Sequence, residues 1–174
     1  RFKESFEFAL LLLKKSIPLF AKDKKSFAFL FDMNELFEKF IGKMFQEIDP
    51  STKLQNQKNF GNLQLKPDII TSNMIIDTKY KILKSRDDLA TNDKYQMFVY
   101  GTNIGIKNTM LLYPKHVNKV KENLKLGEDD KMIGLKMRSV DLDFNGEYGE
   151  FVMEIKSRIG EYKWIIKIDL LIGW

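Results

Sequence analysis

The chain has 174 residues, which is enough for one domain with a sizeable hydrophobic core. Its formal net charge of +5 is moderate, and a solvated surface explains it about as well as a polyanionic partner does. The absence of cysteine excludes disulfides and thiolate metal sites, and a single histidine, His116, argues against zinc hydrolases and two-histidine ribonucleases.

Two helices are predicted in the first third of the chain. Residues 2–16 carry apolar side chains at helical spacing, and Pro18 should end that helix. A charged break at residues 22–25 precedes a short apolar run, which is either a strand or a buried lead-in. An Asp-x-x-Glu capping box beginning at Asp32 then predicts a helix that extends to about Ile48.

The most informative segment is residues 65–81, in which two isoleucine-rich runs flank a Ser-Asn turn. If that turn is the centre of a hairpin, the numbers of facing residues sum to 145, so Asp68 faces Asp77. Lys79 shares the face of Asp77, because side chains alternate along a strand. Directly opposed like charges destabilise a sheet. The segment therefore predicts a cation between the two acids.

The remaining elements are less distinct. Residues 51–62 are polar and are expected to form a loop. The paired isoleucines are apolar on both faces, which is typical of strands covered on both sides. After the hairpin we expect a loop at 84–93, a helix at 92–102, a strand at 109–113, a short basic helix at 115–124, strands at 132–137 and 140–144, and a helix at 149–160, with 164–174 unassigned.

Asp68, Asp77 and Lys79 supply the groups needed to hydrolyse a phosphodiester. Carboxylates hold hard divalent cations, the backbone carbonyl of Thr78 could add a ligand, and a lysine can orient water or stabilise charge. The alternative is a surface hairpin whose acids are solvated or paired with lysines. The spacing of Pro-Asp nine residues before Asp-x-Lys, within apolar strands, favours catalysis.

These residues resemble a known family. Pro67-Asp68 followed by Asp77-Thr78-Lys79 resembles the PD-(D/E)XK nuclease signature. Residues 31–40 are similar to the opening helix of the nuclease part of McrC, from the modified-cytosine restriction system, and residues 93–100 and 111–114 fit the same family. The resemblance covers roughly residues 27–114. It implies an α/β, restriction-endonuclease-like core, in which helices flank a mixed central sheet.

The resemblance also implies further site residues. Glu38 would add a metal ligand, although it could equally be an ordinary exposed helix acid. Gln96 would lie near the active site and Tyr100 near the nucleic acid, and their i, i+4 spacing places both on one helix face. The basic residues near the site, which could contact phosphates, are Lys66, Lys81, Lys84, Arg86 and Lys94.

The function implied is a Mg2+- or Mn2+-dependent endonuclease that cleaves double-stranded DNA, with a ring-forming, McrB-like AAA+ GTPase as partner. The partner would bind a region outside this chain. We expect the chain to be a fragment because it begins at Arg1. Residues 1–174 are interpreted as one nuclease domain, with 1–25 either in the core or in a linker helix. The alternatives are a RecB-like repair nuclease and a non-catalytic DNA-binding or assembly module. The cytoplasm is the default location.

Overall fold

The computed structural model describes residues 16–21, 24–29, 32–83 and 88–172, and its side chains over 32–83 and 88–162. The chain forms two compact units, Arg1–Leu36 and Phe37–Trp174. In the first unit, β1 (Ser16–Ala21) and β2 (Lys24–Phe29) form an antiparallel hairpin. The helix predicted at 2–16 lies outside the described residues except for Ser16, which is in a strand. Of the charged break predicted at 22–25, residues 24–25 are described, and they belong to β2.

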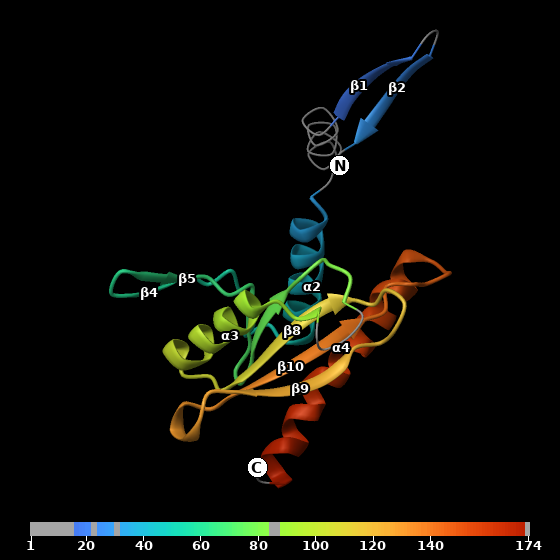
Figure 1. The fold of residues 1–174 in the computed structure, drawn as a ribbon. Helices are drawn as coiled ribbons and strands as arrows, with labels where there is room; N and C mark the ends of the chain where they lie inside the picture. Colours follow the sequence, from blue (N-terminus) through green and yellow to red (C-terminus); the bar gives the residue numbers. More distant parts are fainter. Residues whose placement is uncertain (1–15, 22–23, 30–31, 84–87, 173–174) are drawn as a thin grey trace. The chain divides into compact units, whose positions relative to one another are not determined.

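A mixed sheet of six described strands forms the centre of the second unit (Figure 1). Its middle strands β7, β8 and β10 run parallel to one another, whereas the remaining pairs are antiparallel. In spatial order the strands are β3 (Lys53–Leu54), β6 (Ile69–Ile70), β7 (Ile75–Thr78), β8 (Asn108–Pro114), β10 (Ile133–Val140) and β9 (Lys121–Leu126). A separate ribbon consists of β4 (Lys58–Phe60) and β5 (Leu63–Leu65).

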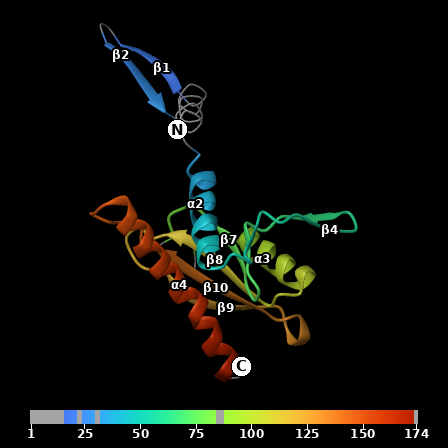
Figure 2. The same cartoon turned by 180° about the vertical axis from the view of Figure 1, so that it is seen from behind.

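Helices cover both faces of this sheet. On one face, α2 (Met33–Ile48) and α4 (Tyr148–Ile172) pack against a core that contains Ile41, Ile76 and Ile155 (Figure 2). On the other face, α3 (Thr91–Ile104) covers a second core that contains Ile75 and Met97. The predicted mixed sheet flanked by helices is therefore confirmed, and the α2 helix that carries Glu38 lies against one of its faces.

The central hairpin has the predicted register. Ile69 pairs with Ile76 and Ile70 with Ile75, so facing numbers sum to 145. The turn is closed by a 2.9 Å hydrogen bond from the backbone N–H of Thr71 to the carbonyl of Met74. Because consecutive isoleucines point to opposite faces, the hairpin contributes to both cores at once.

The capping box and two later elements are also confirmed. Asp32 Oδ1 accepts the N–H of Asn34 at 2.9 Å and that of Glu35 at 3.3 Å, so it caps the helix that ends at Ile48. The helix predicted at 92–102 is α3, which begins at Thr91 and ends at a left-handed Gly105. The strand predicted at 109–113 is β8.

Three predictions were wrong, and a fourth was right in kind but too short. The supposed loop at 51–62 contains β3 and β4. The supposed basic helix at 115–124 is a loop followed by β9, an edge strand whose lysines point to solvent. Val140 ends the long strand β10, so no strand is formed at 141–144. The helix predicted at 149–160 is confirmed as α4, but it passes through Gly160 and continues to Ile172, since tertiary packing of Ile155 and Ile159 outweighs one unfavourable glycine. No helix among the described residues is long and apolar enough to cross a membrane.

Candidate active site

Strand β7 positions Asp77 and Lys79 on the face of the sheet that α3 covers. Asp77 shares this face with Ile75 and is only 2% exposed. The backbone N–H of Lys79 donates to the carbonyl of Leu112 at 2.9 Å, so the chain stays beside β8 after the strand ends. Lys79 Nζ then lies 2.7 Å from Asp77 Oδ2. The Asp-x-Lys alternation thus produces a buried acid beside a half-buried lysine.

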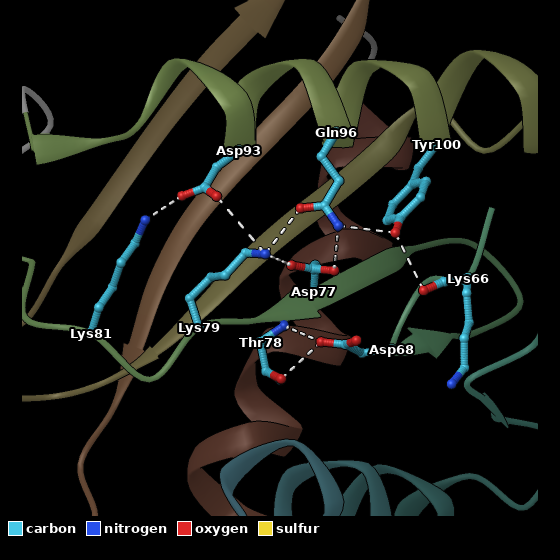
Figure 3. Close-up of polar contacts among 9 residues, drawn as sticks. All are labelled: Lys66, Asp68, Asp77, Thr78, Lys79, Lys81, Asp93, Gln96 and Tyr100. Carbon is cyan, nitrogen blue, oxygen red and sulfur yellow. Dashed lines mark hydrogen bonds and ion pairs between the residues drawn. The ribbon is translucent and has the colours of Figure 1, made fainter. Parts of the chain in front are cut away.

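Asp68 reaches the same end of β7 from the opposite strand of the hairpin. It directly precedes β6, and its Oδ2 accepts the N–H of Thr78 at 2.7 Å and the Thr78 hydroxyl at 2.9 Å (Figure 3). The Asp68 side chain therefore takes the place that a backbone carbonyl would have in a continued ladder. Its other oxygen points away from Thr78 in Figure 3.

Helix α3 contributes Gln96 and Tyr100. Gln96 Oε1 accepts a 2.9 Å hydrogen bond from Lys79 Nζ, while its Nε2 donates to Asp77 Oδ1 at 3.3 Å and to the Tyr100 hydroxyl at 3.0 Å. The Tyr100 hydroxyl in turn donates to the carbonyl of Lys66 at 3.3 Å (Figure 3). One amide thus orients both members of the Asp77–Lys79 pair, because its oxygen accepts a hydrogen bond while its nitrogen donates.

Asp93 is a site residue that we did not predict from the sequence. Its Oδ1 lies 3.8 Å from Lys79 Nζ, and its Oδ2 forms a short ion pair with Lys81. Its i, i+3 spacing to Gln96 was the available signal, because residues three apart share a helix face. Lys79 is therefore held by two carboxylates and one amide.

The buried acid has a strongly displaced pKa. The pKa of Asp77 is raised to about 7, first by burial and then by the negative charge of Asp68, while the charge and hydrogen bond of Lys79 oppose the shift. Burial alone would lower the pKa of Lys79, but Asp77 and then Asp93 raise it on balance, so the ammonium stays charged. Burial also raises the pKa of the Tyr113 hydroxyl, with Asp93 and Asp77 adding to the shift. A buried acid whose ionisation a second carboxylate opposes at one strand end favours a bound cation.

The donor set fits a hard divalent ion. Asp77 Oδ2 is buried and receives no well-directed hydrogen bond from the described residues, its contact with Lys79 being an ion pair. Mg2+ is commonly held by one or two carboxylates, with water completing its shell. Asp68 and Asp77 supply two carboxylates of that kind, and the Thr78 carbonyl as a third ligand stays a prediction from the sequence. Among the described residues no three acids, histidines or cysteines gather as a metal group, and Glu38 instead accepts a short hydrogen bond from Gln55 Nε2.

The predicted phosphate-binding residues differ in their surroundings. Lys66 is exposed at the margin of the site, whereas Lys81 is engaged by Asp93. Lys94 is partly buried on α3. Lys84 and Arg86 lie outside the described residues.

The fold and the site define an α/β protein in which a central parallel strand carries an acid–lysine pair and an adjoining hairpin strand supplies a second acid. A family model described as "McrBC 5-methylcytosine restriction system component" matches residues 1–114, more than half of the chain. The chain belongs to this family of restriction-system components. A comparison with curated proteins finds no match.

A solved structure shares the fold. It is a half-complex from a tetradecameric assembly of Thermococcus gammatolerans McrB AAA+ hexamers with bound McrC, and it matches with a TM-score of 0.55 and 19% identity. The match covers 78% of this chain but only 34% of the chain in that structure. At this identity the likeness establishes the architecture, and the present chain spans about a third of the matched one.

Proposed function

We propose that this chain is the nuclease part of the cleavage subunit of a modification-dependent restriction system, with a PD-(D/E)XK core. It would hydrolyse phosphodiester bonds of double-stranded DNA with Mg2+ or Mn2+. The observation that carries the proposal is the convergence of Asp68, Asp77, Lys79 and Gln96 at one strand end, with Asp77 buried and its pKa raised. Ordinary surface acids have neither this burial nor this set of partners.

Asp68 and Asp77 are the proposed metal ligands, together with the backbone carbonyl of Thr78. When bound, the cation would supply Lewis-acid stabilisation of the phosphate and a water molecule of lowered pKa. Glu38 is proposed as a further ligand, either directly or through water, after release from Gln55. The hydrogen bonds from Thr78 fix one oxygen of Asp68, which pre-orients its carboxylate for this role.

Lys79 is the proposed group for water orientation or transition-state charge. Gln96 Oε1 fixes the lysine ammonium at 2.9 Å, and the Gln96 amide is itself tied to Tyr100. Preorganised donors of this kind stabilise developing negative charge without reorganisation. Lys66, Lys81, Lys84 and Tyr100 are proposed to contact the nucleic acid, where phosphate contacts would position the duplex without reading sequence.

We also propose an AAA+ GTPase as the partner. The support is that the matched structure contains McrB hexamers with bound McrC, and that this chain belongs to the same restriction-system family. The contact with the partner is proposed to lie outside these 174 residues. Cleavage by these residues alone is therefore expected to be weak, and to increase with the partner and GTP only where the partner-binding region is also present.

Nicking of supercoiled plasmid tests the proposal. Wild type, Asp77→Asn and Glu122→Gln would be compared in Mg2+ and in Mn2+, in a protein that also carries the proposed partner-binding region, with the GTPase partner and GTP present. Glu122 is an exposed acid on the edge strand β9, so its variant controls for the loss of one carboxylate. We expect Asp77→Asn to reduce the rate at least about a hundredfold and the control to match wild type. Nicking that survives Asp77→Asn would refute the proposed site.

A further inference from the structure

The β4–β5 ribbon is a feature of the molecule that the candidate active site does not explain. Figures 1 and 2 show it projecting from the body beside α3, apart from the main sheet. Asn59 pairs with Gln64 and Phe60 with Leu63 around a two-residue turn. Gly61 has a φ of +60°, as the first central residue of such a tight hairpin turn requires. The ribbon therefore has a fixed register and two distinct faces.

One face of the ribbon is anchored and the other is free. Leu65 is 5% exposed within the core beneath α3, and Phe60 packs against the same core. Asn59 and Gln64 sit directly opposite each other on the other face, and both are exposed. The ribbon thus uses Leu65 and Phe60 for attachment, leaves Leu63 exposed, and presents a pair of carboxamides to solvent.

The segment around the ribbon contains no acid. Residues 50–67 include no Asp or Glu, although the chain has 24 acids among 174 residues. Lysines supply its charge, and carboxamides supply most of its other polar groups. The lysines are Lys53, Lys58 and Lys66, and the carboxamides are Gln55, Asn56, Gln57, Asn59, Asn62 and Gln64. Lysines attract phosphates, whereas carboxamides can hydrogen-bond the edges of bases in a groove.

The ribbon is continuous with the candidate active site. Strand β5 ends at Leu65, and the next carbonyl, that of Lys66, accepts the hydrogen bond from Tyr100. Asp68 follows two residues later and meets Thr78. A polymer in contact with the ribbon would therefore lie beside the acids, which fits an extended ligand better than a small one.

We infer that the β4–β5 ribbon is a DNA-contacting element. It places the carboxamide face of Asn59 and Gln64 in a groove of duplex DNA, while the exposed Lys66 contacts a flanking phosphate. Two-stranded ribbons are of a size that a duplex groove admits. This inference rests on the proposed nuclease function and adds where the duplex is gripped.

Equilibrium binding to a short labelled duplex, followed by fluorescence anisotropy at fixed salt, tests the inference. The variant Asn59→Asp with Gln64→Glu keeps side-chain shape and adds two negative charges to the carboxamide face. The control Lys131→Glu changes net charge by the same amount in the exposed turn between β9 and β10. That turn precedes β10, at the edge of the parallel strands opposite to the end where Thr78 lies. Circular dichroism would verify that each variant folds.

We expect the ribbon variant to bind at least about tenfold more weakly, and the control to stay within about twofold of wild type. Asn59→Ala with Gln64→Ala should weaken binding in the same direction without any change in charge. Unchanged affinity in both ribbon variants, or an equal loss in the control, would overturn the inference. Normal DNA affinity with lost stimulation by the GTPase partner would assign the ribbon to a protein contact instead.

The same samples separate this inference from the proposed function. If wild type binds and nicks DNA while the ribbon variants bind as wild type does, the ribbon inference alone fails. If the ribbon variants lose affinity but wild type never nicks with metal and partner, the nuclease proposal fails while the DNA-binding ribbon stands.

Discussion

Replacing the buried acid by its neutral isostere should stabilise the metal-free protein. Asp77 is 2% exposed, and its pKa is raised from an ordinary 3.8 to about 7, first by burial and then by Asp68. Each pKa unit corresponds to about 1.4 kcal/mol, so ionising this group in the native state costs on the order of 4 kcal/mol. Asp77→Asn removes that cost. Relaxation around the site reduces the gain, and we expect about 2 to 4 kcal/mol at pH 8.

The size of the effect depends on pH in a defined window. Between pH 4 and about 7 the native state binds a proton at Asp77 that the unfolded chain has released, so wild-type stability falls as pH rises. The variant lacks this contribution. Its advantage over wild type should therefore be small near pH 4 and should reach its full value above about pH 7.

Urea unfolding followed by circular dichroism, at several pH values and in chelator, measures this difference. Taking variant minus wild type cancels the titration of every other group that the substitution leaves unperturbed. If Asp77→Asn is less stable than wild type at pH 8, the ion pair with Lys79 outweighs burial and the repulsion from Asp68, and the electrostatic reasoning is refuted. Added Mn2+ should stabilise only wild type, because only the intact site binds it.

Three further outcomes are expected. Lys79→Met should reduce plasmid nicking at least about a hundredfold, while duplex affinity changes little; equal losses in rate and affinity would make the lysine a binding residue. Gln96→Leu should lower kcat about ten- to a hundredfold with KM nearly constant, because it releases the lysine; an unchanged kcat would contradict that role. Gly101→Ala should destabilise the fold by about 1 to 3 kcal/mol, since the new Cβ would lie 2.9 Å from Ile133. Combined with Ile133→Ala, Gly101→Ala should lower the free energy of unfolding in urea by less than it does alone, because the side chain that it meets is gone. If the losses of the two single variants add up in the double variant, the clash is refuted.

The acidic hairpin could be predicted because its determinants are local. A two-residue turn and paired isoleucines set the register, and alternation then placed Lys79 beside Asp77. The i, i+4 spacing similarly placed Gln96 and Tyr100 on one face of α3. Each of these inferences needed only one strand pair or one helix.

Elements defined by distant partners could not be predicted in this way. Strand β9 is rich in lysine and polar residues and resembles a solvated helix, yet its pairing with β10 across the sheet makes it a strand. The β4–β5 ribbon is held by Phe60 and Leu65 on a core that lies far along the chain. Asp93 acquires its role only when α3 folds over β7. Glu38 was inferred from family resemblance alone, and its role remains a prediction.

The central claim is that the hairpin end holds a divalent cation between Asp68 and Asp77. Calorimetric titration of Mn2+ into wild type, Asp77→Asn and the control Glu122→Gln, each with and without duplex DNA, tests it most directly. We expect binding to wild type and to Glu122→Gln and its loss in Asp77→Asn. No binding to wild type even with DNA present, or undiminished binding to Asp77→Asn, would contradict it.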